Sequence, residues 1–172
     1  MTAEKLAKNI FPLTTMIRYN NVPHIIDESV ASHSFQVSII CISLYEEYKP
    51  KIKSLNLEKM LLMAMLHDIP EISTGDIPYL CKKNNENLKL TLDLIEIDEM
   101  KKIVPEKYFK IFAKYIKKDC PEAVLVKLAD TISSKIYADE EVKAGNSNLI
   151  RVIKESKSGI KQYKKVMKKW MK

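Results

Sequence analysis

The sequence predicts an all-α protein, built as a bundle of about six or seven helices. Apolar residues recur at intervals of three or four through most of the chain, which is the spacing of one helix face. Runs that alternate apolar and polar residues, as half-buried strands do, are absent. The 172 residues are 46% hydrophobic, enough for a core, so we expect residues 1–172 to form a single domain rather than a disordered chain.

The first helix is predicted from residue 2 to about residue 17. Its apolar side is formed by residues spaced three or four apart, namely Leu6, Ile10, Leu13 and Ile17. Arg18 and Tyr19 end this helix, and residues 20–24 read as a loop. A charged residue such as Arg18 at a helix end is normally a surface charge.

The second helix is predicted to begin near Ser29 or Ser32, either of which can cap it, and to end at Pro50. Its buried stripe consists of Val37, Ile40, Cys41, Leu44 and Tyr48. His33 lies four residues before Val37, so it falls on the same stripe in the first helical turn. A lone histidine on an apolar face is more often a core residue with a hydrogen-bond partner than a metal ligand.

The third helix is predicted from Leu57 to Asp68, with Asn56 as its cap. Residues 60–66 are apolar on all sides, which indicates a buried helix. Pro70 disfavours a helical conformation at the preceding residue, so His67 and Asp68 should lie at the helix end. Two polar groups at a buried helix end need partners, either a metal ion or an ordinary hydrogen-bond network. Since His33 lies in the first turn of another buried helix, one site shared by both histidines is the stronger hypothesis.

The residues after this helix extend the polar cluster. Glu71 lies three residues after Asp68, one turn further on if a short helix resumes at Pro70. Residues 74–76, Thr-Gly-Asp, read as a tight turn because glycine tolerates positive φ and aspartate bonds its own backbone. Four groups able to bind a cation or move a proton thus fall within ten residues: His67, Asp68, Glu71 and Asp76.

The second half of the chain is predicted to be a polar loop followed by four helices. The loop covers residues 79–86, and the first helix runs from about Asn87 to Ile103. Pro105 and Pro121 each open a further helix at its first turn, the second of these reaching about Val142 before a stop at Gly145. A last, basic helix covers about residues 147–171.

Charge and composition exclude several classes of protein. The formal net charge is +7, but the lysines are scattered, and their densest cluster (residues 161–172) favours a solvated helix face over binding of nucleic acid. Three separated cysteines without a Cys-x-x-Cys pair argue against a disulfide framework and a thiolate zinc site. With three glycines there is no glycine-rich phosphate loop of the Walker or Rossmann type.

No segment predicts export or a membrane span. The N-terminus lacks the signal-peptide pattern, and no stretch reaches the roughly 20 apolar residues that a transmembrane helix needs. We therefore expect the protein to reside in a reducing cytoplasm, without a membrane partner.

Taken together, these residues resemble a known family. His33, the pair His67-Asp68, and Asp130 in the segment Lys-Leu-Ala-Asp resemble the H…HD…D set of the HD-domain phosphohydrolases. Arg18, the segment 29–34 and the HD-x-x-E-x-x-x-G-D-x-P arrangement of residues 67–78 look more narrowly like the HD-domain 5′-deoxynucleotidases. The resemblance covers about residues 10–150. It implies an HD-domain helical bundle, a homodimer, a divalent metal such as manganese or cobalt, and hydrolysis of deoxyribonucleoside 5′-monophosphates to deoxynucleoside and phosphate.

The resemblance also implies a role for each site residue. It makes His33, His67, Asp68 and Asp130 the metal ligands, a mixed nitrogen and oxygen set that suits manganese, cobalt, iron or zinc. Glu71 becomes the catalytic carboxylate, and Asp76 contacts the substrate or donates a proton. Arg18 offers a planar fork for phosphate oxygens. Tyr19 stands near the sugar, where members of the family often carry tryptophan. Without the resemblance, nothing distinguishes Asp130 from Asp119 or Asp139.

Two other functions remain as alternatives. The first is a different HD phosphohydrolase, acting on a phosphodiester, a nucleoside triphosphate or a modified nucleotide. The second is a non-enzymatic basic helical module that binds nucleic acid or another partner, which predicts no bound metal and a steep dependence of binding on salt.

Overall fold

The computed structural model describes residues 2–77 and 79–171, and the all-α prediction is confirmed within them. Nine α-helices are present in this part of the chain, seven of them eight residues or longer, and the only β-type pairing there is one isolated bridge. The helices are α1 (Ala3–Ile10), α2 (Val30–Tyr48), α3 (Leu57–Leu66), α4 (Glu71–Thr74), α5 (Tyr79–Asn84), α6 (Glu86–Ile103), α7 (Glu106–Lys117), α8 (Pro121–Lys143) and α9 (Ile150–Met167).

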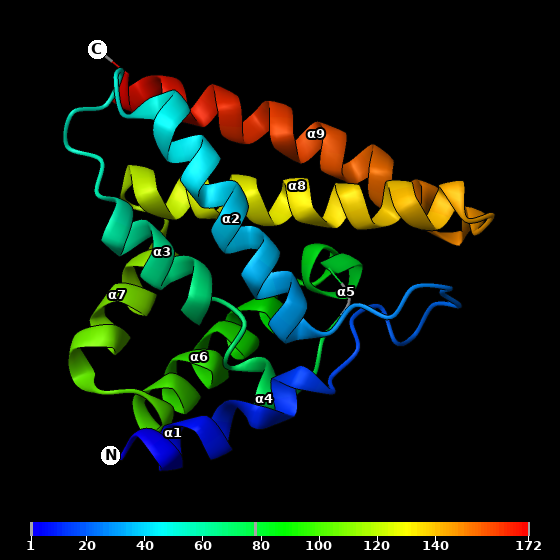
Figure 1. Cartoon of the computed structure of the whole chain (residues 1–172), viewed down its shortest axis with the longest axis horizontal. Coiled ribbons are helices and arrows are strands. Elements are labelled where there is room, and N and C mark those ends of the chain that lie inside the picture. The colour runs from blue at the N-terminus through cyan, green and yellow to red at the C-terminus, as the bar shows by residue number, and fades with distance from the viewer. Residues whose placement is uncertain (1, 78, 172) are drawn as a thin grey trace.

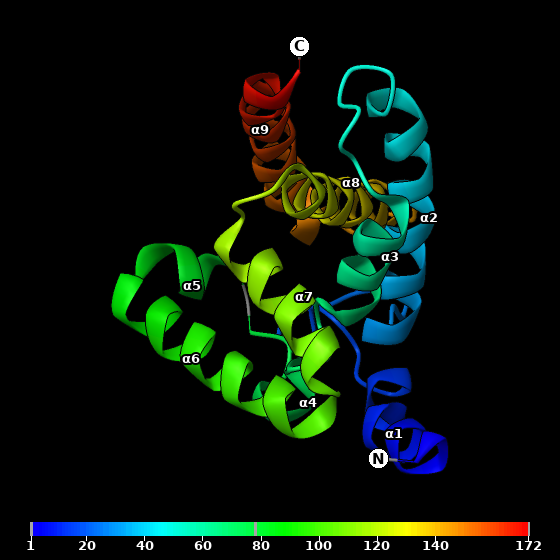
Figure 2. The same ribbon diagram turned by 90° about the vertical axis from the view of Figure 1, so that its left-hand side faces the viewer.

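Helix α8 lies at the centre of the bundle. It packs against α2, α3, α7 and α9, with α9 running alongside it (Figure 1). Figure 2 shows α7 between α3 and α6 on the other side of the molecule. Because α8 is covered on several sides, most of its buried residues are apolar, with Glu122, Ser133 and Glu141 as the buried polar ones.

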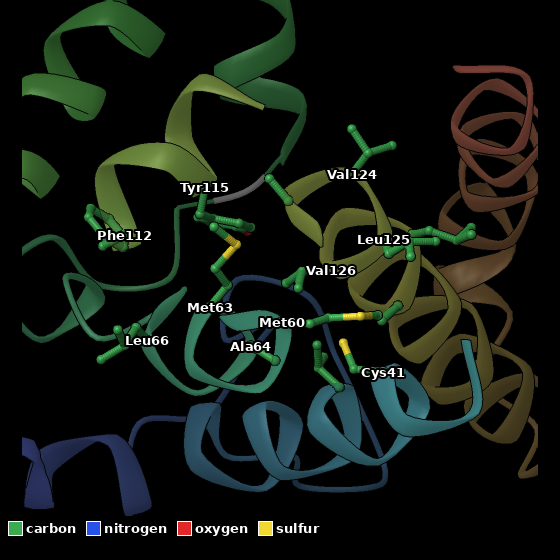
Figure 3. Packing of buried hydrophobic residues seen from close by; sticks show 14 of the residues in the cluster. Cys41, Met60, Met63, Ala64, Leu66, Phe112, Tyr115, Val124, Leu125 and Val126 are labelled. Atoms are coloured by element: carbon green, nitrogen blue, oxygen red, sulfur yellow. The ribbon is translucent and has the colours of Figure 1, made fainter. Parts of the chain in front are cut away.

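The core fills the space between α2, α3, α7 and α8. Met60 and Met63 of α3 pack between Cys41 of α2 and the aromatic pair Phe112 and Tyr115 of α7 (Figure 3). All of these side chains are at most 2% exposed, and methionine adapts to irregular gaps between packed helices. The buried end of α3, where Leu66 leads into His67, continues this core toward the polar cluster.

The predicted helix caps are confirmed. Ser29 accepts a hydrogen bond from the backbone of Ser32 at the start of α2, and Asn56 does the same for Lys59 at the start of α3. Gly75 has φ of 72° after α4, a backbone conformation that favours glycine. Helix α3 ends at Leu66 rather than Asp68, but His67 keeps helical dihedrals as the C-cap, so its side chain still lies at the helix end.

Two predicted elements were wrong. The helix expected over residues 2–17 ends at Ile10, where a 3-10 turn (Phe11–Thr14) begins, because Pro12 cannot occupy a helix interior without losing a hydrogen bond and clashing with the preceding turn. The polar loop expected over residues 79–86 contains helix α5 instead. Lysine is a good helix former, so a polar, lysine-rich segment does not by itself indicate irregular backbone.

The chain after the 3-10 turn is extended and pairs with the start of α2. The backbone N–H of Arg18 donates to the carbonyl of Glu28, and that of Val30 donates to Met16, both at 2.9 Å. This pairing brings Arg18 beside the first turn of α2, which carries His33. Among the described residues no helix has the length and apolar character needed to cross a membrane.

Candidate metal centre and active site

Three side chains with metal-binding atoms meet where the buried ends of α2 and α3 converge. One ligand atom each from His33, His67 and Asp68 lie within 4.8 Å of one another. The centroids of the two imidazole rings are 5.5 Å apart, and His33 and His67 are only 0% and 3% exposed. The structure therefore brings the two histidines together, as the shared-site hypothesis requires.

His67 presents a nitrogen that nothing in the described chain satisfies. Its Nδ1 lies 2.7 Å from the carbonyl oxygen of Ala64, so Nδ1 is the donor of this contact. Its Nε2 is buried and lies 3.0 Å from Asp68 Oδ2, but the two atoms lack the alignment of a hydrogen bond. A backbone carbonyl bound to one nitrogen is the usual way to orient a histidine whose other nitrogen binds a metal.

The electrostatics of Asp68 fit a cation site. Although burial opposes ionisation, His67 and His33 hold the pKa of Asp68 well below its usual range, so its carboxylate stays charged. In return, Asp68 raises the pKa of His67 in spite of burial. A divalent cation bound to these two groups would take the place of that proton.

Asp130 of α8 lies at the same cluster. Its Oδ1 is 3.2 Å from His33 Nε2, and its Oδ2 is 3.3 Å from Lys127 Nζ. Asp68 Oδ2 lies 3.7 Å from the same His33 nitrogen. All four residues predicted as metal ligands are thus brought together, from three helix segments far apart in the sequence. Two imidazole nitrogens and two carboxylates fit a divalent metal of intermediate softness.

The other nitrogen of His33 contacts residues that the sequence did not identify as part of the site. His33 Nδ1 lies 3.0 Å from Ser133 Oγ, and the Ser133 hydroxyl donates a hydrogen bond to Gln36 Oε1. Ser133 could have been noticed, because it lies one turn after Asp130 on the same face of α8. Gln36 follows His33 by one turn of α2, but nothing in its type or spacing distinguishes it.

Arg18 is a buried part of the site rather than a surface charge. Its NH1 lies 2.5 Å from Glu28 Oε2 and 2.7 Å from His33 Nδ1, and NH2 donates to Ser134 Oγ at 3.3 Å. These contacts use three of the five N–H donors of the guanidinium group. Glu28 was not predicted. Its contact with Arg18 depends on the bridge between the extended segment and the start of α2.

Tyr19 and Asp76 are held against each other. Tyr19 has φ of 56°, an uncommon conformation for a residue with a side chain, and its backbone N–H donates to Asp76 Oδ2 at 2.8 Å. The Tyr19 ring stacks on Tyr137 of α8 with centroids 5.3 Å apart, and the Arg18 guanidinium lies 5.1 Å from its centroid. Asp76 therefore fixes the backbone next to Arg18, and the Tyr19 ring contacts both Tyr137 and Arg18.

Glu71 is the first residue of α4 and is buried beside the cluster. Its Oε2 is without a hydrogen-bond partner in the described structure. Burial, together with the charges of Asp68 and Asp76, raises the pKa of Glu71 to about 10. A carboxyl group in this state holds a proton at neutral pH, and a divalent cation at Asp68 would offset the repulsion and make that proton easier to release.

The helical arrangement is that of the HD-domain fold. An HD-domain phosphohydrolase from Listeria innocua has the same fold, with a TM-score of 0.78 at 19% identity, over 96% of this chain and 82% of that one. A cyanophage S-2L HD phosphohydrolase, DatZ, solved with dA and one catalytic zinc ion, aligns over 98% of both chains with a TM-score of 0.60 at 18% identity.

The chain belongs to the YfbR-like 5′-deoxynucleotidase family, whose sequence profile matches residues 5–171. This range is wider than the segment, about 10–150, on which the resemblance rested. A 5′-deoxynucleotidase of Enterobacter sp. strain 638 is 34% identical over 130 residues. The match covers 72% of this chain and 65% of the length of that curated relative.

Proposed function

We propose that the protein is a metal-dependent phosphohydrolase that converts deoxyribonucleoside 5′-monophosphates to deoxynucleoside and phosphate. The observation that carries the proposal is the buried cluster of His33, His67 and Asp68, with one imidazole nitrogen lacking a partner, in a chain of the YfbR-like family. Arg18 and Glu71 beside that cluster supply the groups that phosphate binding and water activation need.

The proposed metal ligands are His33, His67, Asp68 and Asp130. Their mixed nitrogen and oxygen donors suit manganese or cobalt, and also the zinc named for the cyanophage protein. When bound, such an ion makes a coordinated water more acidic and polarises the phosphoryl group. Asp68 and Asp130 balance its charge, so the two histidines can bind it without net repulsion.

Glu71 is the proposed general base, because its carboxyl group lies one turn beyond Asp68 and is shielded from solvent. It accepts a proton from the attacking water and holds it in a site where burial favours the neutral form. Arg18 binds phosphate oxygens with the donors that Glu28, His33 and Ser134 leave free. Asp76 accepts a hydrogen bond from the Tyr19 backbone N–H and thereby holds Tyr19 and the neighbouring Arg18 in position.

Tyr19 is proposed to pack at the sugar. Its ring stacks on Tyr137 and lies against the Arg18 guanidinium, so it is held beside the proposed phosphate-binding group. Discrimination between deoxyribose and ribose would then depend on the space left beside the Tyr19 ring.

The remaining proposals concern the setting of the enzyme. We infer one HD domain over residues 1–172, a homodimer as in the family, and a place in the cytoplasm. Nucleic acid is not a proposed partner, because the basic residues are spread over the surface of several helices rather than gathered around the site.

The test is to measure the metal content of the purified protein and phosphate release from dAMP, AMP and dATP with Mn²⁺ or Co²⁺. Phosphate from dAMP with little from AMP supports the proposal in full. Equal release from dAMP and AMP broadens the activity to a 5′-nucleotidase. Pyrophosphate or triphosphate from dATP, without release from dAMP, points to another HD phosphohydrolase. A protein without metal and without any release contradicts the proposal.

A further inference from the structure

Lys127 lies at the metal centre but takes no part in the function proposed above. Its Nζ is 3.3 Å from Asp130 Oδ2 and 4.8 Å from the centroid of the Tyr115 ring. Tyr115 in turn meets the ring of His67 edge-on, with centroids 5.9 Å apart. The side chain of Lys127 is 26% exposed, so it is partly shielded from solvent.

Lys127 is a permanent cation in this place. Burial alone would disfavour its charge, but Tyr115, Asp130 and Asp68 raise the pKa of Lys127 well above its ordinary value. The ammonium group has three donors, of which Asp130 needs one.

The Lys127 cation shares its carboxylate partner with the proposed metal. Arg18 is matched by Glu28 at 2.5 Å, whereas Asp130, 3.3 Å from Lys127, is also a proposed metal ligand. With a divalent metal bound, Asp130 would serve two cations, which leaves Lys127 with charge and donors for an anion. A phosphate monoester is a dianion, and it is bound most strongly where charged donors in a partly shielded site face it.

The position of Lys127 complements that of Arg18. Arg18 contacts His33 at Nδ1, whereas Lys127 contacts Asp130, whose Oδ1 lies at Nε2 of the same ring. The two cations are therefore linked to different nitrogens of His33. A phosphoryl group bound at the cluster could receive hydrogen bonds from both cations.

We propose that Lys127 is a substrate-contacting residue whose ammonium group binds an oxygen of the phosphoryl group on the Asp130 side of the metal centre. This inference rests on the proposed function, in that it assigns the substrate's phosphoryl group to this site. The competing role is purely structural: Lys127 would only hold the Asp130 carboxylate in place for the metal. The two roles differ in what they predict for anion binding once the metal is saturating.

The test compares Lys127→Met and Lys127→Arg with Lys143→Met as a matched control. Lys143 is on the same helix, is 71% exposed and pairs only with Glu140. Two dissociation constants are measured by calorimetry for each variant, that of Mn²⁺ alone and that of inorganic phosphate at saturating Mn²⁺. We expect Lys127→Met to weaken phosphate binding by about 10- to 100-fold, the usual loss for one charged hydrogen bond. Lys127→Arg should restore most of it, and Lys143→Met should change neither constant.

The outcomes separate the two roles. Weaker Mn²⁺ binding with unchanged phosphate binding at saturating Mn²⁺ overturns the proposal in favour of the structural role. If Lys127→Met does not fold, Lys127→Gln, which keeps a donor but not the charge, is measured in the same way and decides by the same criterion. A wild-type protein that binds phosphate through Lys127 but releases none from dAMP contradicts the proposed function and leaves this inference standing.

Discussion

At the scale of single residues, the chemistry of the site depends on nitrogen atoms that have different partners. His67 uses Nδ1 on a backbone carbonyl of its own helix, which leaves Nε2 turned toward Asp68 without a hydrogen bond. His33 has polar partners at both nitrogens, Arg18 and Ser133 at one and Asp130 at the other. The third histidine, His24, instead pairs with Asp27 in a loop away from the cluster.

Replacing His33 by alanine should remove the metal. Since His33 comes from a different helix than His67 and Asp68, the remaining ligands cannot close around the ion without it. Elemental analysis of the purified variant should show metal occupancy reduced at least about tenfold relative to wild type. His24→Ala is the matched control and should keep full occupancy. Equal metal content in His33→Ala and wild type would contradict the ligand role.

Glu71 should make the metal-free protein less stable as the pH rises. Its pKa is about 10 in the folded chain and about 4.3 when unfolded, so the folded chain holds a proton that the unfolded one has lost at neutral pH. The resulting loss of folding stability is absent below the pKa that Glu71 has in the unfolded chain, and it grows as the pH rises above that value. Glu71→Gln should therefore stabilise the metal-free protein at pH 7 by about 1–3 kcal/mol, with little gain near pH 4.

Denaturant unfolding in the presence of a chelator, at pH 4.5 and pH 7.5, measures this difference. Glu46→Gln, which replaces an exposed carboxyl group on α2, is the control and should leave the free energy of unfolding unchanged at both pH values. A Glu71→Gln variant that is no more stable than wild type at pH 7.5 would show that the folded chain does not hold that proton.

The sequence identifies the site residues only where local pattern and chemistry coincide. The pair His67-Asp68 could be found because an apolar helix becomes polar at one point, and Glu71 follows by one turn. Asp130 could not be found this way, since an aspartate on a long helix looks like any other. Ser133 shares a face of α8 with Asp130, but its contact with His33 joins residues 100 apart in the chain and has no local signal.

At the scale of elements, the sequence predicted the long helices and their caps, and it was wrong where proline or composition had to be weighed. Serine and asparagine caps mark helix starts through a bond to a backbone three residues on, which is local information. The loop that carries Tyr19 is different, because its conformation is set by α8. Glu141 of α8 accepts the backbone N–H groups of Ile25, at 3.0 Å, and Ile26, at 2.5 Å, and Asn146 donates to it as well.

Glu141→Ala should loosen this loop and thereby weaken the Arg18–Tyr19 part of the site. Hydrogen bonds to a charged group contribute about 1.5–3 kcal/mol net of the desolvation of that group. The free energy of unfolding should therefore fall by about that amount. The KM for a monophosphate should rise more than kcat falls, since no reacting atom is touched. Glu140→Ala, the adjacent exposed residue paired with Lys143, is the control.

The same contact predicts a pH dependence. Although burial opposes ionisation, bonds from Asn146 and from the Ile26 and Ile25 backbones lower the pKa of Glu141. Its contribution is therefore present above the unfolded carboxyl pKa and is lost as the pH falls through the lower folded value. Wild type should lose stability on acidification more steeply than Glu141→Gln, measured by thermal unfolding between pH 3 and pH 6. Parallel curves for the two proteins would argue against an ionised Glu141 in the folded chain.

At the scale of the whole molecule, the site joins parts of the chain that only folding brings together. The four residues at the cluster lie at positions 33, 67, 68 and 130, on helices α2 and α8 and at the end of α3, which all pack on one core. A cation that binds this arrangement has no equivalent site in the unfolded chain, since the ligands are then far apart. Its binding free energy therefore adds to the free energy of unfolding.

Adding Mn²⁺ or Co²⁺ to the metal-free protein should accordingly raise its Tm. At a free metal concentration 100 times the dissociation constant the gain is about 2.7 kcal/mol, which for a chain of this size corresponds to roughly 5–10 °C. The melting temperature, followed by circular dichroism, should rise further with each tenfold increase in metal, and a chelator should reverse it. The double variant His33→Ala and His67→Ala should show no such rise, because only the cluster couples the ion to the fold. An equal rise in that variant would mean that the stabilising ion binds elsewhere on the surface.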